Sequence, residues 1–235
     1  MTAPSGRLDV ENLRVAGEGG RMILDVASLN VAPGSAVAVR GPSGAGKSTL
    51  LYALAGLLRP DAGAIRWDGT DIAALGESRR AAFRRERIGF IFQEHLLFEE
   101  LTARDNAAIA ALYAPSGARG AIREAGSARL ARLGLDGAAG RRCDSFSGGE
   151  RQRIAVARAL AGAPDIILAD EPTASLDRAN ADRLAGDLIT LAREEGRTLI
   201  AVSHDTALHA AADRVIGIAD GTLMPDGAAG APVNA

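Results

Sequence analysis

The segment from Gly41 to Thr49 has the residue types needed to hold a phosphate chain. It fits the pattern Gly-x-x-x-x-Gly-Lys-Ser/Thr and consists of Gly41, Pro42, Ser43, Gly44, Ala45, Gly46, Lys47, Ser48 and Thr49. Glycines let backbone N–H groups turn toward phosphate oxygens, the lysine adds a positive charge, and the Ser48 hydroxyl can ligate Mg²⁺. An ordinary glycine-rich turn is the alternative. It is disfavoured because a strand-like run, Ala36–Val39, precedes the segment and a helix-like run, Thr49–Leu58, follows it.

Two carboxylates, Asp170 and Glu171, follow the apolar run Ile166–Ala169. Ligands of an open parallel sheet bind at the carboxyl ends of its strands, so we expect both acids to face the phosphates. Asp170 is suited to hold Mg²⁺, directly or through water, and Glu171 to polarise an attacking water. Alternatively, both are solvated acids that begin a turn before Pro172. The buried strand before them disfavours that interpretation.

Two further polar residues follow apolar runs in the same way. His204 comes after Leu199–Val202, and Gln93 comes after Ile88–Phe92. A lone histidine is more often structural than functional, but at a strand end an imidazole can donate a hydrogen bond to a γ-phosphate. The Gln93 amide can reach Mg²⁺ or the attacking water. We therefore assign Glu171, His204 and Gln93 to catalysis, and Ser48, Gln93 and Asp170 to the metal.

A second candidate anion site consists of Ser147, Gly148 and Gly149, which precede a helical pattern, Arg151–Leu160. A serine at a helix N-terminus caps the helix, and the free N–H groups there attract anions. One chain rarely needs two such sites for one triphosphate. This segment therefore separates the chain from the many ATPases and GTPases that share the first two motifs.

The elements that must position these residues indicate an α/β fold. Alternating or short apolar runs predict an N-terminal antiparallel β layer from Leu8–Val15, Met22–Val31 and Ala64–Trp67. Short runs rich in Val and Ile predict parallel strands buried on both faces: Ala36–Val39, Ile88–Phe92, Ile166–Ala169 and Leu199–Val202. From about Ala103 to Ala161 the spacing is helical, with interruptions at Pro115–Gly117 and Gly134.

We interpret residues 1–235 as a single domain with internal parts. Residues 1–93 and 163–224 are expected to form the nucleotide-binding core, and residues 94–162 an inserted helical subdomain. Residues 225–235 are mainly Pro, Gly and Ala with little to bury, so we expect them to be disordered.

Composition excludes several classes of protein. The formal net charge is −2, with 27 basic and 29 acidic residues, so no overall field favours nucleic acid. No apolar stretch approaches the roughly 20 residues that cross a bilayer, and Met1–Arg7 does not resemble a signal peptide. Cys143 is the only cysteine, which suits a reducing cytosol.

Together these motifs resemble the ATP-binding cassette (ABC) family, from about Leu8 to Met224. The phosphate loop, Gln93, the Ser147–Glu150 signature, the two acids, the Ser175–Asp177 turn and His204 occur in that family's order and spacing. Two residues depart from the family pattern: Phe146 replaces the usual Leu, and Glu150 the usual Gln.

The resemblance implies a P-loop, RecA-like core that binds and hydrolyses ATP with Mg²⁺. It also implies a homodimer or heterodimer of cassettes joined head to tail. Ser147 and Gly149 of one subunit would then close on the γ-phosphate held by Lys47 of the other, and Asp177 would link the two sites.

Within the family, the segments Arg84–Gln93, Gly149–Arg153 and Leu168–Thr173 resemble the branch for lipoprotein release, macrolide-type export and cell division. The resemblance implies a separate transmembrane permease, docked near Glu94, His95, Leu96, Leu97 and Phe98, and a cytoplasmic protein held at the inner membrane by that partner. Simple packing of the three apolar residues is an equal alternative. A cassette that transmits force or signal without transport, as in cell division, is the alternative function.

One expected feature is missing. Most members of the family place an aromatic ring after the first strand to stack on adenine, but the segment Leu13–Glu18 contains none. We therefore expect weak ATP binding by the monomer and poor discrimination among purine triphosphates, unless Arg14 or Arg21 stacks on the base.

Overall fold

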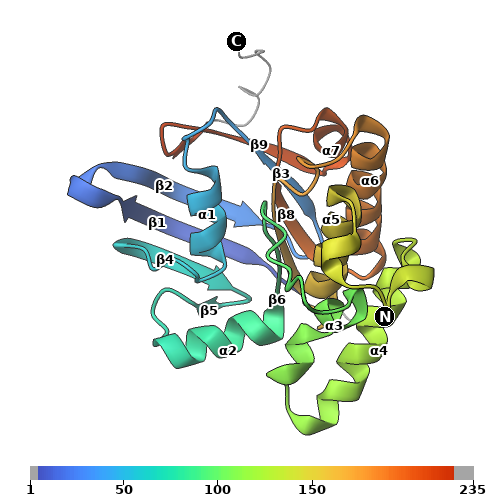
Figure 1. Ribbon diagram of the computed structural model, residues 1–235. Helices are drawn as coiled ribbons and strands as arrows, with labels where there is room; N and C mark the ends of the chain where they lie inside the picture. Colours follow the sequence, from blue (N-terminus) through green and yellow to red (C-terminus); the bar gives the residue numbers. More distant parts are fainter. Residues whose placement is uncertain (1–4, 225–235) are drawn as a thin grey trace.

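A computed structural model describes residues 5–224 and confirms the α/β class, with two sheets and a helical segment (Figure 1). The expected disordered tail, residues 225–235, lies outside the described residues. The strands are β1 Leu8–Ala16, β2 Met22–Val31, β3 Ala36–Arg40, β4 Ala62–Trp67, β5 Thr70–Asp71, β6 Ile88–Ile91, β7 Ile166–Asp170, β8 Thr198–Val202, β9 Arg214–Ala219 and β10 Thr222–Leu223. The α-helices are α1 Lys47–Leu54, α2 Glu77–Arg87, α3 Ala103–Ala107, α4 Ser116–Arg132, α5 Gly148–Leu160, α6 Arg178–Glu194 and α7 Thr206–Ala211.

The first sheet is the expected antiparallel layer, in the order β2-β1-β4-β5. The second has the order β10-β9-β3-β8-β7-β6 in the described residues, and only its β9–β10 pair is antiparallel. Because the inner strands are parallel, their carboxyl ends meet at one edge of the sheet. The segments after β3, β6, β7 and β8 carry the predicted site residues, so the topology brings them to that edge.

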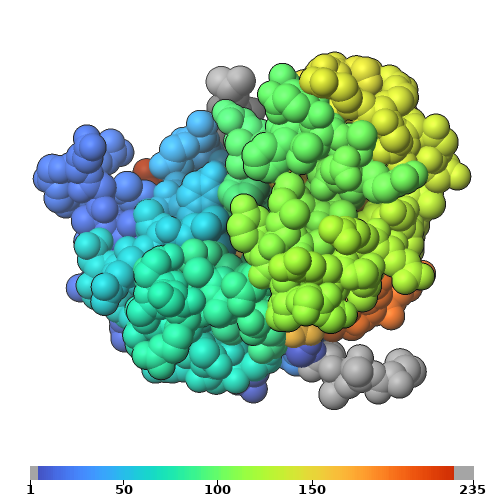
Figure 2. All heavy atoms as spheres, turned by 60° about the horizontal axis from the view of Figure 1, so that its bottom comes forward, coloured from blue at the N-terminus to red at the C-terminus, as the bar shows by residue number. Residues whose placement is uncertain are grey.

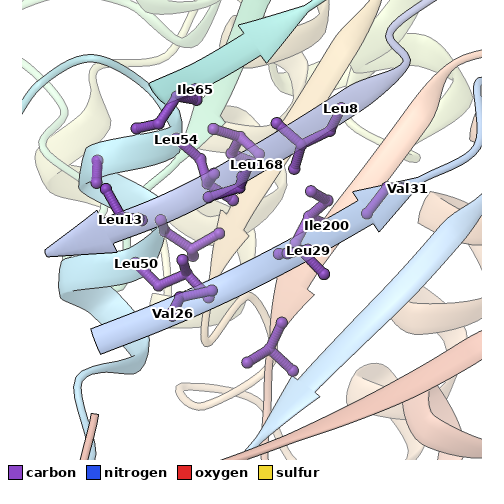
Figure 3. Close-up of a cluster of buried hydrophobic side chains, with 14 of the residues drawn as sticks. Leu8, Leu13, Val26, Leu29, Val31, Leu50, Leu54, Ile65, Leu168 and Ile200 are labelled. Atoms are coloured by element: carbon purple, nitrogen blue, oxygen red, sulfur yellow. The ribbon is translucent and has the colours of Figure 1, made fainter. Parts of the chain in front are cut away.

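Strands β3, β7 and β8 are buried on both faces, as their continuous apolar runs predict. The edge strand β6 is only partly buried, because no further strand of the described residues covers its outer side. In β8, for example, Ile200 and Val202 belong to one cluster, and Leu199 and Ala201 to another. The first cluster lies between the two sheets and includes α1. Figure 3 shows Leu50 and Leu54 of α1 among side chains from β1, β2, β7 and β8. The second cluster packs against α5, α6 and α7.

Between β6 and β7 the described residues form helices, 3-10 helices and loops but no strand, apart from one isolated β-bridge. The 3-10 helices of the described residues are η1 Glu18–Gly20 in the N-terminal layer and, within this segment, η2 Ile109–Leu112, η3 Asp136–Ala138 and η4 Cys143–Ser145. Here α3, α4 and α5 enclose a third, smaller core that includes Leu130, Phe146 and Ile154. This helical segment thus has its own core and carries Ser147 at the start of α5.

The first helix differs from the expected Thr49–Leu58. It begins at Lys47, inside the phosphate loop, and ends at Leu54. Gly56 has φ of 63°, a left-handed conformation that ends helices. The N–H groups of Leu57 and Leu58 then donate to the carbonyl of Tyr52. The apolar residues after Leu54 therefore belong to the helix end and the turn beyond it.

Candidate active site

The phosphate loop connects β3 to α1 and depends on close backbone contacts. Gly44 and Gly46 have φ of 77° and 95°. A Cβ atom at Gly41 would lie 2.1 Å from the carbonyl oxygen of Ile218, so no larger residue fits there. The Lys47 Nζ donates to the carbonyls of Gly41 and Pro42, both at 2.9 Å. The lysine charge is therefore held within the loop, at the start of α1, where an anion is also favoured by the helix dipole.

Asp170 lies at the carboxyl end of β7 and is almost fully buried, with 1% exposure. Burial raises the pKa of Asp170, while a hydrogen bond with Ser48 and the charge of Lys47 oppose that shift. Its Oδ1 atom has no hydrogen-bond partner among the described residues. A buried carboxylate oxygen without a partner is costly unless a cation or water occupies the space beside it. The geometry therefore fits a Mg²⁺ held by Asp170 and Ser48.

Glu171 and His204 contact each other at the ends of β7 and β8. The Glu171 Oε1 lies 3.3 Å from the His204 Nε2, and the backbone N–H of His204 donates to Oε2 at 3.3 Å. Glu171 has φ of 46°, and its own N–H donates to the carbonyl of Val202. Burial raises the pKa of Glu171, opposed mainly by His204. A carboxylate with a raised pKa is suited to accept a proton from water.

A cavity of about 670 Å³ brings most of the predicted residues together. Those that line it are Ser43, Gly44, Gly46, Lys47, Ser48, Thr49, Gln93, Asp170, Glu171 and His204. Sequence reasoning missed several other lining side chains, among them Ile23, Thr173, Arg178 and Asp205. Ile23 comes from the antiparallel layer, which shows that both sheets contribute to this cavity. The Pro172-Thr173 pair directly after the two acids was a signal for Thr173, whereas nothing in the pattern marked Ile23.

Ser147, Gly148 and Gly149 do not line this cavity in the described part of the chain. Ser147 caps α5, and its hydroxyl accepts from the N–H of Glu150. Ser147 and Gly148 are exposed to solvent. A single subunit therefore presents the two predicted anion sites separately.

The signature packs against the turn that contains Asp177. A Cβ atom at Gly149 would lie 2.8 Å from the Cδ2 of Leu176, so the glycine permits this contact. Asp177 is exposed and caps α6 by accepting from the N–H and the side-chain amide of Asn180 at 3.1 and 2.6 Å. These hydrogen bonds lower the pKa of Asp177. The signature and this turn thus form one continuous surface.

The segment after Gln93 is held by two other elements. Arg158 of α5 donates to the carbonyls of His95 and Leu96 at 2.8 and 2.5 Å. The His95 Nε2 lies 3.3 Å from the Ser175 Oγ, and the pKa of His95 is lowered by burial and by nearby arginines. Of the apolar residues in the predicted docking segment, Leu97 packs on the helical core, while Leu96 and Phe98 are each 54% exposed.

This fold and this cavity define a P-loop nucleotide-hydrolysing cassette. A family model described as "ABC transporter" matches residues 24–174. The chain belongs to the ABC transporter family, as its motifs indicate, and it is an ABC ATPase that hydrolyses ATP to ADP and phosphate.

Two kinds of curated relative match nearly the whole chain. The "Lipoprotein-releasing system ATP-binding protein LolD" of Porphyromonas gingivalis is 42% identical over 93% of this chain and 99% of the relative. The "Macrolide export ATP-binding/permease protein MacB 1/2" of Paracoccus denitrificans is 44% identical over 92% of this chain. The chain spans only 32% of the latter protein. The predicted branch is therefore confirmed.

Solved structures agree with the fold. The "Dimeric Structure of MJ0796, a Bacterial ABC Transporter Cassette" has a TM-score of 0.83 and 32% identity, covering 92% of this chain and 96% of that chain. The same cassette was solved as a dimer in a post-hydrolysis state bound to ADP and Pi. No helix in the described residues has the length and apolarity of a membrane span.

Proposed function

We propose that two copies of this cassette close head to tail around two Mg·ATP and thereby drive a transmembrane permease. The observation that supports this proposal most is that the phosphate loop and the Ser147–Gly149 signature are separate within one subunit. The cavity contains the phosphate loop and the acids, while Ser147 and Gly148 are exposed outside it. A second copy can supply those groups to the γ-phosphate. The dimeric relative supports this arrangement.

Each predicted residue has a role in this closed site. Lys47 and the loop N–H groups bind the β- and γ-phosphates, and Ser48, Asp170 and Gln93 hold Mg²⁺. When bound, Mg²⁺ neutralises charge on the phosphates. Glu171 accepts a proton from the attacking water, and its contact with His204 fixes the carboxylate in position. Asp177, on the exposed turn beside the signature, carries the state of one site to the other.

The permease is proposed to dock beside the segment Glu94–Phe98. A groove of about 430 Å³ runs between α2 and the helical segment, lined by Arg84, Phe90, Tyr113 and Arg158 among others. Figure 2 shows the furrow where these two parts of the molecule meet. Tyr113 is 73% exposed, and Leu96 and Phe98 add further apolar surface. Aromatic and basic side chains of this kind fit an amphipathic helix with acidic residues. Docking would hold the cassette at the cytoplasmic face of the inner membrane.

The test is co-purification from detergent-solubilised membranes with Glu171→Gln as bait and Mg·ATP present. We expect a cassette dimer bound to a separate multi-span membrane protein, and loss of that protein when Leu96 and Phe98 are both changed to Asp. A partner with few spans and a large external domain would favour the force-transmitting alternative. A monomer without a membrane partner would contradict the proposal.

A further inference from the structure

The carboxylate of Glu150 occupies the polar groups of the signature in the free subunit. Its Oε2 atom accepts from the backbone N–H of Ser147 at 2.8 Å and from the Ser147 hydroxyl at 2.8 Å. The Ser147 hydroxyl also accepts from the N–H of Glu150 at 3.4 Å. The serine hydroxyl proton is therefore already donated to an anion belonging to the same helix.

This anion is charged and lies at a position where the helix attracts negative charge. The pKa of Glu150 is lowered, first by the N–H and hydroxyl of Ser147 and then by the charges of Arg141 and Arg153. Glu150 lies in the first turn of α5, so its carboxylate neutralises the positive end of the helix dipole. Less of that dipole is left to attract a phosphate.

In the proposed dimer, the γ-phosphate of the partner's ATP needs the same donors. The hydroxyl proton of Ser147 cannot serve Glu150 and a phosphate oxygen at the same time. Two anions at one helix terminus also repel each other. A glutamine at this position would accept the same hydrogen bond without the charge.

We propose that Glu150 is an internal competitor for the γ-phosphate and sets the ATP concentration at which two cassettes close. This inference rests on the proposed head-to-tail dimer. The free subunit keeps its signature satisfied by Glu150. Closure requires the carboxylate to release Ser147, so a higher ATP concentration is needed than for an uncharged residue.

The test compares Glu171→Gln with the double variant Glu171→Gln, Glu150→Gln. Dimer formation is followed by light scattering on gel filtration over a series of Mg·ATP concentrations. We expect Glu150→Gln to lower the ATP concentration for half-maximal dimer by about threefold or more, from the charge at the helix end. Because Gln also completes a capping box, the midpoint of thermal unfolding should stay unchanged. Raising the salt concentration should shrink the difference, since the effect is electrostatic.

Glu99→Gln is the matched control. Glu99 forms an ion pair at 3.4 Å with Arg151, which lies in α5 beside Glu150, but it forms no hydrogen bond with Ser147. It should leave the ATP dependence unchanged. Equal half-maximal concentrations with and without Glu150→Gln, in dimers that do form, would overturn the competitor role while leaving the proposed function intact. Failure of both proteins to dimerise at any ATP concentration would refute the proposed dimer and this inference with it.

Discussion

At the scale of single residues, Glu171 combines burial with a fixed position. Replacing it by Gln keeps its shape and the hydrogen bond from the N–H of His204 but removes the carboxylate that accepts a proton. We expect ATP binding to persist and phosphate release to fall by at least about a hundredfold. Phosphate release and equilibrium ATP binding measure the two effects. Glu86→Gln on the exposed face of α2 is the control, and near-native turnover by Glu171→Gln would exclude it as the base.

The pH dependence follows from the same residue. Burial raises the pKa of Glu171 above that of an ordinary glutamate. Glu171 can accept a proton only when it is deprotonated. The rate of hydrolysis should therefore be maximal above the raised pKa of Glu171 and fall as the pH drops through that pKa. The acidic limb of the rate profile should therefore lie at a higher pH than the usual glutamate pKa. A profile whose acidic limb lies at or below that value would contradict this assignment.

The missing aromatic ring gives a second residue-scale prediction. Ala16, at the end of β1, is exposed, whereas a Cβ atom at Gly17 would lie 2.7 Å from the Cδ1 of Ile23. Ile23 lines the nucleotide cavity, so Ala16→Tyr adds a ring without displacing it. Stacking on the base should tighten ATP binding about tenfold, near the low end of the usual range.

Titrating the native protein and Ala16→Tyr with ATP and GTP measures that gain. Ala16→Leu is the control, since it adds apolar surface without a ring. Strong native preference for ATP, unchanged by the tyrosine, would mean that another group already holds the base.

The sequence predicted where these residues lie better than what they contact. Motif spacing brought Lys47, Asp170 and Glu171 to one predicted site because each follows a strand whose end faces the ligand in an open parallel sheet, and the three residues do line one cavity. A hydrogen bond between Glu150 and Ser147 could be inferred from the capping pattern. The sequence does not show that it would occupy both the backbone N–H and the hydroxyl of Ser147. Ile23 could not be found, because its place in the cavity depends on how two separate sheets pack.

At the scale of elements, apolar runs located β3, β6, β7 and β8 but missed one inner strand of the same sheet. The strand β9, with the run Val215–Ile218, was not predicted although it pairs with β3 along Val37–Arg40. Its burial is less complete than that of β7 or β8, so its apolar pattern is weaker. Pairing across more than 170 residues depends on tertiary packing rather than on local pattern.

Two ion pairs join the helical segment to the core. Arg129 of α4 contacts Glu195 at the end of α6 at 2.7 Å, with side chains 17% and 24% exposed. Arg132 contacts Glu194, also at 2.7 Å, but these two side chains are far more exposed, at 46% and 57%. Less solvent screening should give the first pair a coupling energy of about 1 kcal/mol and the second a few tenths of that.

Double-mutant cycles to alanine, measured by urea unfolding, compare the two pairs directly. The pair Arg132–Glu194 serves as the matched control, because it joins the same helices. Equal coupling energies would show that burial does not decide the strength of this connection.

At the scale of the whole molecule, the proposed dimer makes each subunit half of a catalytic site. Its cavity supplies Lys47, Asp170 and Glu171, while Ser147 and Asp177 are exposed to solvent and do not line that cavity. A second copy turned by a two-fold rotation would complete both sites at once. Because two subunits must meet to form each site, we expect the rate of ATP hydrolysis to depend steeply on protein concentration.

Ser147→Arg tests this composite site. The arginine fills the space for the partner's phosphate but lies outside the cavity of its own subunit, so ATP binding by the monomer should be unchanged. Added to Glu171→Gln, it should return the ATP-bound dimer to a monomer on gel filtration. Ser116→Arg, at the exposed start of α4, is the control and should leave the dimer intact.

Mixing two inactive proteins extends the test. Lys47→Ala removes the charge that contacts the phosphates, and Ser147→Arg blocks closure on the partner. A mixed dimer contains one site built from the intact loop of the second protein and the intact signature of the first. Some ATPase activity should therefore return on mixing, as measured by phosphate release against each protein alone. If the site instead lay within one chain, the mixture would stay inactive. The Glu171→Gln, Ser147→Arg variant would then keep ATP bound, just as Glu171→Gln alone does.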